Sequence, residues 1–170
     1  MNQNTFDVVG RYEKVAFFGV TDAEGQITYN RMRGFTEIST SKNPKEYSRQ
    51  YIDEKSERTD VIGYATSMSY SFDEIEGDAV HSDLVKIEEN ELVGSGAVRE
   101  ILIVYLNREA GAEGTFEARK RSFSVVPDAS GDSTDAMTHS GTFKANGEAV
   151  SGTATSTDGW QTAVFTSEEV

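Results

Sequence analysis

The stretch that decides the fold is Val61-Ile62-Gly63-Tyr64-Ala65-Thr66-Ser67-Met68-Ser69-Tyr70-Ser71-Phe72. From Ile62 onward the even positions are mostly large and apolar, and the odd positions are mostly small or polar. Because successive side chains of a strand point to opposite faces, this alternation predicts a half-buried antiparallel strand over 61–72. Other elements of the chain must cover its apolar face.

On the N-terminal side of this strand, the sequence predicts an arm and a hairpin. Residues 1–13 are polar and irregular, which is typical of a flexible N-terminal arm. The apolar run 15–20, the turn residues 21–25 and the run 26–29 predict a β-hairpin. We expect its second strand to continue through Ile38, with a bend or bulge at Gly34.

Residues 41–58 interrupt the strand pattern with a segment dense in charge. It is longer than most connections between strands, so we predict a long loop, and long ordered loops tend to be functional. Tyr47, Tyr51 and Ile52 give this loop large side chains of the kind that anchor protein contacts.

One helix follows the opening stretch. Asp78 can cap its N-terminus, and Val80, Leu84 and Ile87 fall on one face at helical spacing. The predicted helix runs over about 79–90, and Gly94 and Gly96 end the segment.

Further strands are indicated toward the C-terminus. The run 101–106 is the most apolar of the chain and predicts a buried strand, 115–126 predicts another, and 127–132 reads as a loop. Asn146-Gly147 and Asp158-Gly159 both tolerate the positive φ angles of tight hairpin turns, which predicts a three-stranded C-terminal meander.

These elements sum to a mostly-β fold in one domain. We expect a β-sandwich or partly closed barrel of about eight antiparallel strands, with one flanking α-helix, over residues 14–170. The 170 residues suffice for one domain with a core, and 15 glycines with 2 prolines suit tight turns.

The net charge argues against nucleic-acid binding and on its own is best explained by solubility. The formal net charge is -13, and 61–98 and 122–170 are strongly acidic. A nucleic-acid binder needs the opposite sign. The mean hydropathy of -0.51 indicates a thin core, or a core that is completed in an oligomer. Without cysteines the chain has no disulfides or thiolate sites, and it has no apolar run long enough for a membrane span.

The sequence offers no candidate catalytic residues. His81 and His139 lack metal-ligand spacing, and we expect His81 to lie solvated near the helix start. Asp128, Asp132 and Asp135 read as a solvated turn rather than a cation loop. No nucleophile, base and orienting group are arranged together, so we predict no enzyme, no cofactor and no metal.

One basic cluster, Arg119-Lys120-Arg121, stands out from the acidic chain. Strand alternation sends Lys120 to one face and Arg119 and Arg121 to the other. Since its neighbours are acidic and no aromatic residues interleave with it, we interpret the cluster as part of a salt-bridged subunit contact.

The order of these segments resembles phage tail tube proteins. The resemblance rests on the strand and charged loop of 34–54, the returning segments 61–64 and 69–73, the helix, the strand 101–106 and the hairpin 141–153. The resemblance covers nearly the whole chain. It rests on the order of the segments and on the kinds of residue in each, because the sequence contains no catalytic signature.

The resemblance implies a structural virion protein of the tail, assembled in the bacterial cytoplasm. Six subunits would form a ring, rings would stack into a hollow tube, and the long loop would reach a neighbouring subunit. The tape-measure protein would fill the lumen before ejection, and double-stranded DNA would pass through it without specific binding. Tail terminator and baseplate or tip proteins would bind the ends, and no membrane would be involved.

The residues expected at inter-subunit contacts are Tyr47, Arg49, Tyr51, Ile52, Arg119 and Arg121. Two alternatives stay open. The chain would be the tube subunit of a contractile tail or phage-derived bacteriocin, or it would be a carbohydrate-binding β-sandwich, for which Trp160 is the only aromatic support.

Overall fold

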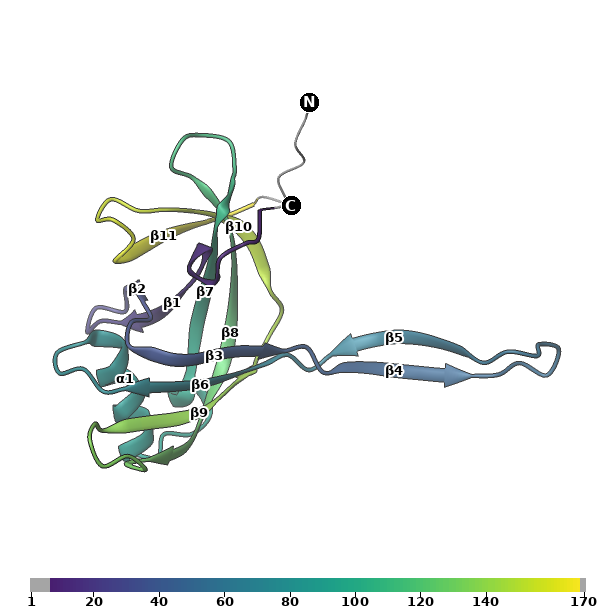
Figure 1. The fold of residues 1–170 in the computed structure, drawn as a ribbon, viewed down its shortest axis with the longest axis horizontal. Coiled ribbons are helices and arrows are strands. Elements are labelled where there is room, and N and C mark those ends of the chain that lie inside the picture. Colours follow the sequence, from purple (N-terminus) through teal and green to yellow (C-terminus); the bar gives the residue numbers. More distant parts are fainter. Residues whose placement is uncertain (1–6, 169–170) are drawn as a thin grey trace.

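A computed structural model describes residues 7–168 of the chain (Figure 1). It has eleven strands, one α-helix and two short 3₁₀ turns. The elements are η1 (Arg11–Glu13), β1 (Lys14–Thr21), β2 (Ile27–Arg31), β3 (Phe35–Ser41), β4 (Pro44–Arg49), β5 (Arg58–Tyr64), β6 (Ser67–Asp73), α1 (Ala79–Glu89), η2 (Gly94–Ala97), β7 (Val98–Glu109), β8 (Phe116–Ser130), β9 (Thr138–Ala145), β10 (Val150–Thr155) and β11 (Thr162–Ser167). The mostly-β class and the helix are confirmed, with more strands than expected. Part of the predicted arm, 1–6, lies outside the described residues.

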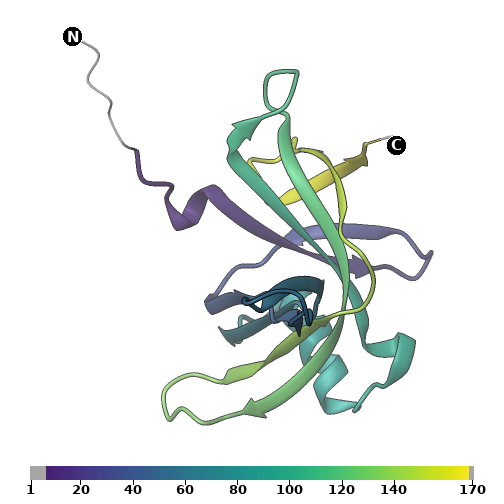
Figure 2. The ribbon, with the colours of Figure 1, turned by 90° about the vertical axis from the view of Figure 1, so that its right-hand side faces the viewer.

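Nine strands form one antiparallel sheet in the order β10-β11-β2-β1-β7-β8-β9-β6-β3. The sheet closes on itself because β10 also pairs with β8, and this makes a barrel of the first six strands. The long strand β8 serves both parts: residues 116–120 pair with β10, and residues 123–130 pair with β9. Strands β9, β6 and β3 therefore extend from the barrel as a curved wing (Figures 1 and 2).

Strands β1 and β7 lie between two hydrophobic cores. Phe17 and Leu102 face the barrel core, whereas their neighbours Phe18 and Ile101 face a second core between the wing and the helix. All four side chains are essentially fully buried. A strand buried on both faces loses the alternation of a half-exposed one, which explains the continuous apolar runs in these two segments.

Helix α1 covers the second core, as its periodicity predicts. Asp78 caps it by accepting hydrogen bonds from the backbone N–H groups of Val80 and His81, at 3.0 and 3.1 Å. Val80, Leu84 and Ile87 are buried in the second core. The predicted bounds are correct to within one residue.

The opening stretch forms two strands instead of one. β5 ends at Tyr64, Ala65 and Thr66 belong to neither strand, and β6 begins at Ser67. Met68, Tyr70 and Phe72 are buried as the alternation predicts. Ile62 and Tyr64 are 66% and 60% exposed, so the prediction of a half-buried strand is wrong for 61–64. The physical reason is that β5 pairs only with β4, away from both cores.

The predicted strand through Ile38 and the predicted loop at 127–132 both differ from the structure. The hairpin of β1 and β2 is confirmed, but β2 ends at Arg31 instead of running to Ile38. Gly34, at φ 72°, takes the chain into a separate strand, β3. The loop predicted at 127–132 is strand up to Ser130, because a bulge after Pro127 accommodates the residue that lacks an N–H.

The predicted C-terminal meander is also wrong. β9 and β10 do not pair with each other across Asn146-Gly147, since each pairs with a different half of β8. β10 and β11 do form an antiparallel hairpin. Its connection is longer than a two-residue turn, and Asp158 stabilises it by accepting hydrogen bonds from the backbone N–H groups of Gln161 and Thr162, at 3.1 and 3.0 Å.

Candidate functional site

A hairpin arm, made of β4 and β5 with the turn between them (residues 44–64), projects far from the barrel (Figure 1). Within residues 7–168 its two strands pair only with each other. The sequence predicts a loop over 41–58, but Pro44–Arg49 within it is strand β4, and residues 50–57 form the connection to β5. The sequence did not predict strand β4, because both faces of the arm are open to solvent and no alternation of apolar and polar residues marks the strand.

On the β4 side, the arm joins the body at Asn43, which has an unusual backbone conformation. Asn43 has a φ of 45°, in the left-handed region that asparagine tolerates better than most residues. Its carbonyl accepts from the N–H of Ala65 at 3.1 Å, and its side-chain Nδ2 donates to the carbonyl of Ala65 at 3.0 Å. The same Nδ2 also donates to Ser67 Oγ at 3.2 Å. These bonds clamp the two strands where they leave the body.

Three of the predicted contact residues gather on the arm. Arg49 donates from Nε to the hydroxyl of Tyr51 at 2.7 Å, and its NH1 lies 2.6 Å from the Asp60 carboxylate. Its guanidinium also lies 5.1 and 5.4 Å from the ring centroids of Tyr47 and Tyr51. Arg49 therefore holds both rings in place, and Tyr47 and Tyr51 remain about half exposed.

Ile52 lies in the turn at the far end of the arm and is fully exposed. Three more large side chains of the arm are exposed, all from β5, and sequence reasoning missed them: Val61, Ile62 and Tyr64. The arm thus presents apolar surface on an element that contacts little of its own chain. Exposed apolar patches of this kind mark interaction sites.

Arg119 and Arg121 lie elsewhere, on β8 in the body. They face a groove of about 540 Å³, which we call the basic groove. Its described lining is Arg11, Lys14, Ile38, Ser39, Thr40, Lys42, Thr66, Met68, Ile101, Ile103, Tyr105, Arg119, Arg121, Phe123 and Ala149. The structure therefore places the arm residues and these two arginines in separate surfaces.

Lys120 points to the opposite face of β8, as strand alternation predicts. Its Nζ lies 3.7 Å from Glu100 Oε2 and 5.2 Å from the centroid of the Phe165 ring. Glu100 also accepts a hydrogen bond from the Tyr29 hydroxyl. Burial, with the hydrogen bond and charge of Glu100, raises the pKa of Tyr29 above its ordinary value. Lys120 is thus paired within its own subunit.

The expectation that His81 is solvated is wrong, because the side chain is completely buried. Its Nδ1 accepts from the backbone N–H of Ile75 at 2.9 Å, so Nε2 carries the proton and donates to the Arg33 carbonyl at 2.6 Å. Its ring packs 4.5 Å from that of Phe72. His81 is therefore a satisfied core residue that ties the helix start to the loops beside it.

His139 is buried between two carboxylates. Both ring nitrogens lie 2.8 Å from an acceptor, Nδ1 from Glu88 Oε2 and Nε2 from Glu74 Oε2. Carboxylates only accept, so the ring donates from both nitrogens as an imidazolium. Burial alone would lower the pKa of His139, but the hydrogen bonds and charges of Glu74 and Glu88 outweigh it and raise the pKa. The bridge ties α1 to β9 and to the loop after β6.

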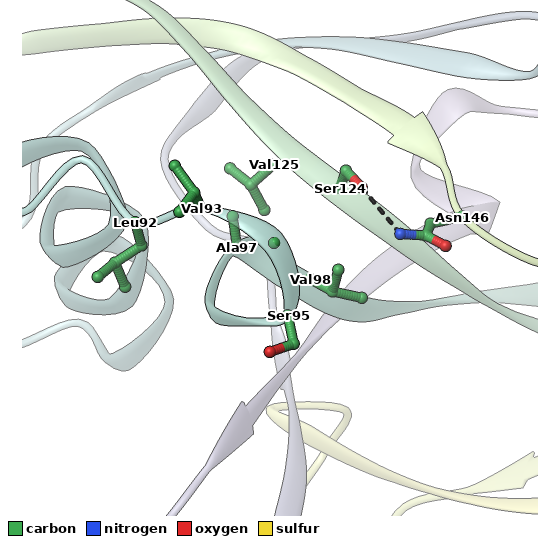
Figure 3. Close-up of a pocket in the computed structure, with 9 residues that line it drawn as sticks. Leu92, Val93, Ser95, Ala97, Val98, Ser124, Val125 and Asn146 are labelled. Carbon is green, nitrogen blue, oxygen red and sulfur yellow. Dashed lines mark hydrogen bonds between the residues drawn. The ribbon is translucent and has the colours of Figure 1, made fainter.

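A second hollow, of about 610 Å³, lies between η2 and β8 (Figure 3). Its lining is Leu92, Val93, Gly94, Ser95, Ala97, Val98, Ser124, Val125 and Asn146. The only hydrogen bond between these side chains runs from Asn146 Nδ2 to Ser124 Oγ, at 3.0 Å. None of the lining side chains titrates near neutral pH, so this hollow offers no acid–base pair.

Residues 7–168 form neither a cluster of metal ligands nor a membrane-spanning helix. No group of three or more histidine or carboxylate side chains there is arranged to hold a metal ion. No helix in that range is long and apolar enough to cross a bilayer. Trp160 is partly buried and packs against the barrel core, with its ring centroid 5.6 Å from that of Phe116 and 6.2 Å from that of Phe17.

The sequence matches no protein-family model, and a search of curated proteins returns no match. The hairpin arm and the basic groove are therefore interpreted from their own geometry.

Proposed function

We propose that this protein is a structural subunit that assembles with copies of itself, through the hairpin arm, into stacked rings that form a tube. The observation that carries the proposal is the arm itself. A two-stranded hairpin with both faces in water is at best marginally stable alone. An arm that keeps large apolar side chains exposed is best explained by a surface that covers it in an assembly.

The resemblance to phage tail tube proteins supports the more specific version of this proposal. In that version six subunits form each ring, and the tube belongs to a virion tail with tape-measure protein and then genomic DNA in its lumen. The net charge of -13 suits a channel through which DNA slides, because a lumen of like charge does not retain phosphates. The tube of a contractile tail or bacteriocin would use the same subunit.

A free sheet edge adds a second reason to expect assembly. Among residues 7–168, β3 ends the nine-stranded sheet and has a neighbour, β6, on one side only. Exposed edges pair with other chains unless something covers them. A ring formed by a head-to-tail contact covers such an edge in every subunit.

The experiment compares the intact protein with a variant in which residues 44–64 are replaced by a short Gly-Ser turn. We expect the intact protein to form rings or tubes at high concentration, seen by light scattering and negative-stain microscopy. The variant should keep the circular dichroism spectrum and melting temperature of the body but stay monomeric, because the arm lies outside both cores.

A finer comparison removes only apolar surface. The double variant Tyr51→Ser and Ile52→Ser should weaken assembly, whereas Val164→Ser, which removes an exposed valine from β11, should not. An intact protein that stays monomeric at every concentration would rule the proposal out. Equal assembly with and without the arm would reject the role of the arm.

A further inference from the structure

The basic groove is an exception to the charge of the whole molecule. The chain has 16 basic and 29 acidic residues, yet Arg11, Lys14, Lys42, Arg119 and Arg121 all line this one groove. No acidic side chain is among its described lining residues. Like charges that face one hollow repel each other, so the arrangement favours a negatively charged occupant.

The groove cations are not neutralised by their own subunit. None of these five residues forms an ion pair with another described residue, in contrast to Lys120 and Arg99, which do. Their hydrogen bonds go to backbone carbonyls instead: Arg11 NH1 donates to Lys14 at 2.6 Å, and Arg121 Nε donates to Gly147 at 2.7 Å. These bonds orient the two guanidinium groups and leave their charges unopposed.

The floor of the groove is apolar. Met68, Ile101 and Phe123 are buried beneath the charged rim. A partner that fits this surface carries carboxylates at its edge and an apolar side chain at its centre. A nucleic-acid backbone offers the charge without the apolar part, and the net charge of -13 repels it at long range.

The opposite end of β3 and β6 carries acidic and apolar side chains that complement the basic groove. The last residue of β6 with the loop after it (residues 73–78) and the loop before β9 (residues 131–137) lie together, joined by a 2.8 Å hydrogen bond from Glu74 N to the Met137 carbonyl. We call these two loops the acidic end. They contain no lysine or arginine, and their exposed acidic residues are Asp73, Glu74, Glu76, Asp132 and Asp135. Ile75 and Met137 are also about half exposed there.

One subunit cannot join these two surfaces to each other. Phe35 pairs with Phe72 at the acidic end of β3 and β6, and Ser41 pairs with Ser67 at the groove end. Seven residues of strand separate the ends by about 20 Å. The acidic end and the groove residues 38–42 therefore lie toward opposite ends of β3 and β6, and Figure 1 shows the arm leaving from the groove end of these strands.

From this complementarity we propose that the basic groove receives the acidic end of a second copy of the chain. The contact is head-to-tail, so every subunit offers one groove and one acidic end, and such contacts propagate into closed rings or stacks. The inference rests on the proposed function in requiring self-association, but it names a contact separate from the hairpin arm.

The test reverses charge on each surface. The groove variant is Arg119→Glu with Arg121→Glu, and the end variant is Glu76→Arg with Asp135→Arg. We expect each alone to raise the concentration needed for assembly by roughly tenfold or more, since like charges then meet in the contact. Mixing the two variants should restore assembly, because each groove then finds an end of opposite charge. Mass photometry across a concentration series measures both effects.

The controls separate this contact from folding and from self-assembly in general. Lys144→Glu changes an exposed lysine outside the groove and should match the wild type, whereas the single variant Arg119→Glu should not. All variants should keep the wild-type melting temperature within a few degrees.

The outcomes distinguish the two proposals. A wild type that never assembles overturns the proposed function. A wild type that assembles, with charge variants that assemble equally or mixtures that do not recover, overturns the groove contact only. Fluorescence anisotropy with a labelled DNA duplex, showing binding that Arg119→Glu abolishes, would also overturn it, because nucleic acid would then be the occupant.

Discussion

His139 shows at the residue scale how surroundings fix a protonation state. A histidine that donates from both nitrogens to Glu74 and Glu88 is charged, and its pKa is raised above the ordinary value of about 6.5. A raised pKa in the folded state means that folding favours the protonated form. The stabilisation is fully present below the unfolded pKa and disappears as pH rises through the folded pKa.

We therefore predict that the free energy of unfolding falls as pH rises from about 6 through the folded pKa of His139. His139→Gln should lose this pH-dependent component and be less stable at pH 6 by about 1–3 kcal/mol, because the carboxylates of Glu74 and Glu88 lose a charged donor. Urea unfolding of both proteins across this pH range measures the effect. Parallel pH curves for wild type and variant would show that His139 is not the group responsible.

At the element scale the hairpin arm depends on its joint. Asn43 combines a positive φ with two side-chain hydrogen bonds, to Ala65 and Ser67. Glycine adopts the same backbone without strain but has no side chain to donate. The variant Asn43→Gly thus removes the side-chain hydrogen bonds and keeps the positive φ angle.

We predict that Asn43→Gly speeds hydrogen exchange of the Ala65 amide by roughly fivefold, the equivalent of about 1 kcal/mol for the lost hydrogen bonds. Amides of the barrel strand β7 should exchange as in the wild type, because they lie in a separate, fully packed region. Hydrogen exchange followed by NMR resolves both sites. Unchanged exchange at Ala65 would mean that the backbone pairing alone holds the joint.

The elements also differ in how far sequence predicts them. Helix α1 is predicted almost to the residue, because its cap and its apolar face are both local signals. The buried runs around Phe17 and Leu102 are likewise identified as strands. The pairing of β9 and β10 with different halves of β8 is not predicted, since the Asn146-Gly147 signal describes a local turn and carries no information on long-range partners.

The same limit applies to the candidate surfaces. Tyr47, Tyr51 and Ile52 are recognisable because large side chains in a charged segment are unusual, and the structure places them on the arm. Ile62 and Tyr64 continue the alternation of the next strand, so only the three-dimensional break at Ala65 shows that they are exposed. Lys42 and Arg11 reach the groove from segments distant from β8, and no spacing rule brings them together.

At the scale of the whole molecule, the two cores share a wall. Phe17 and Phe18 are neighbours in β1, yet the first is buried in the barrel core and the second in the core under α1. Loss of either core removes packing from the same strand, and this couples the barrel and the wing into one folding unit.

We predict that Phe17→Ala and Phe18→Ala each lower the free energy of unfolding by about 3–5 kcal/mol, the usual cost of emptying a large aromatic site. Each variant should still unfold in a single transition, with the same midpoint when followed by tryptophan fluorescence and by circular dichroism. Trp160 reports on the barrel core, since its ring lies 6.2 Å from that of Phe17. Two separated transitions in the Phe18→Ala protein would show that the cores fold independently.

The length of the arm has a geometric consequence. About ten residues of extended chain from Asn43 to the turn span about 30 Å, and a body of this size is about 35–40 Å across. An arm that long can reach most of the way across an adjacent subunit. In a tube built this way each subunit would hold one neighbour with its own arm and be held by the arm of another, so a subunit that came loose at one contact would stay tethered at the other.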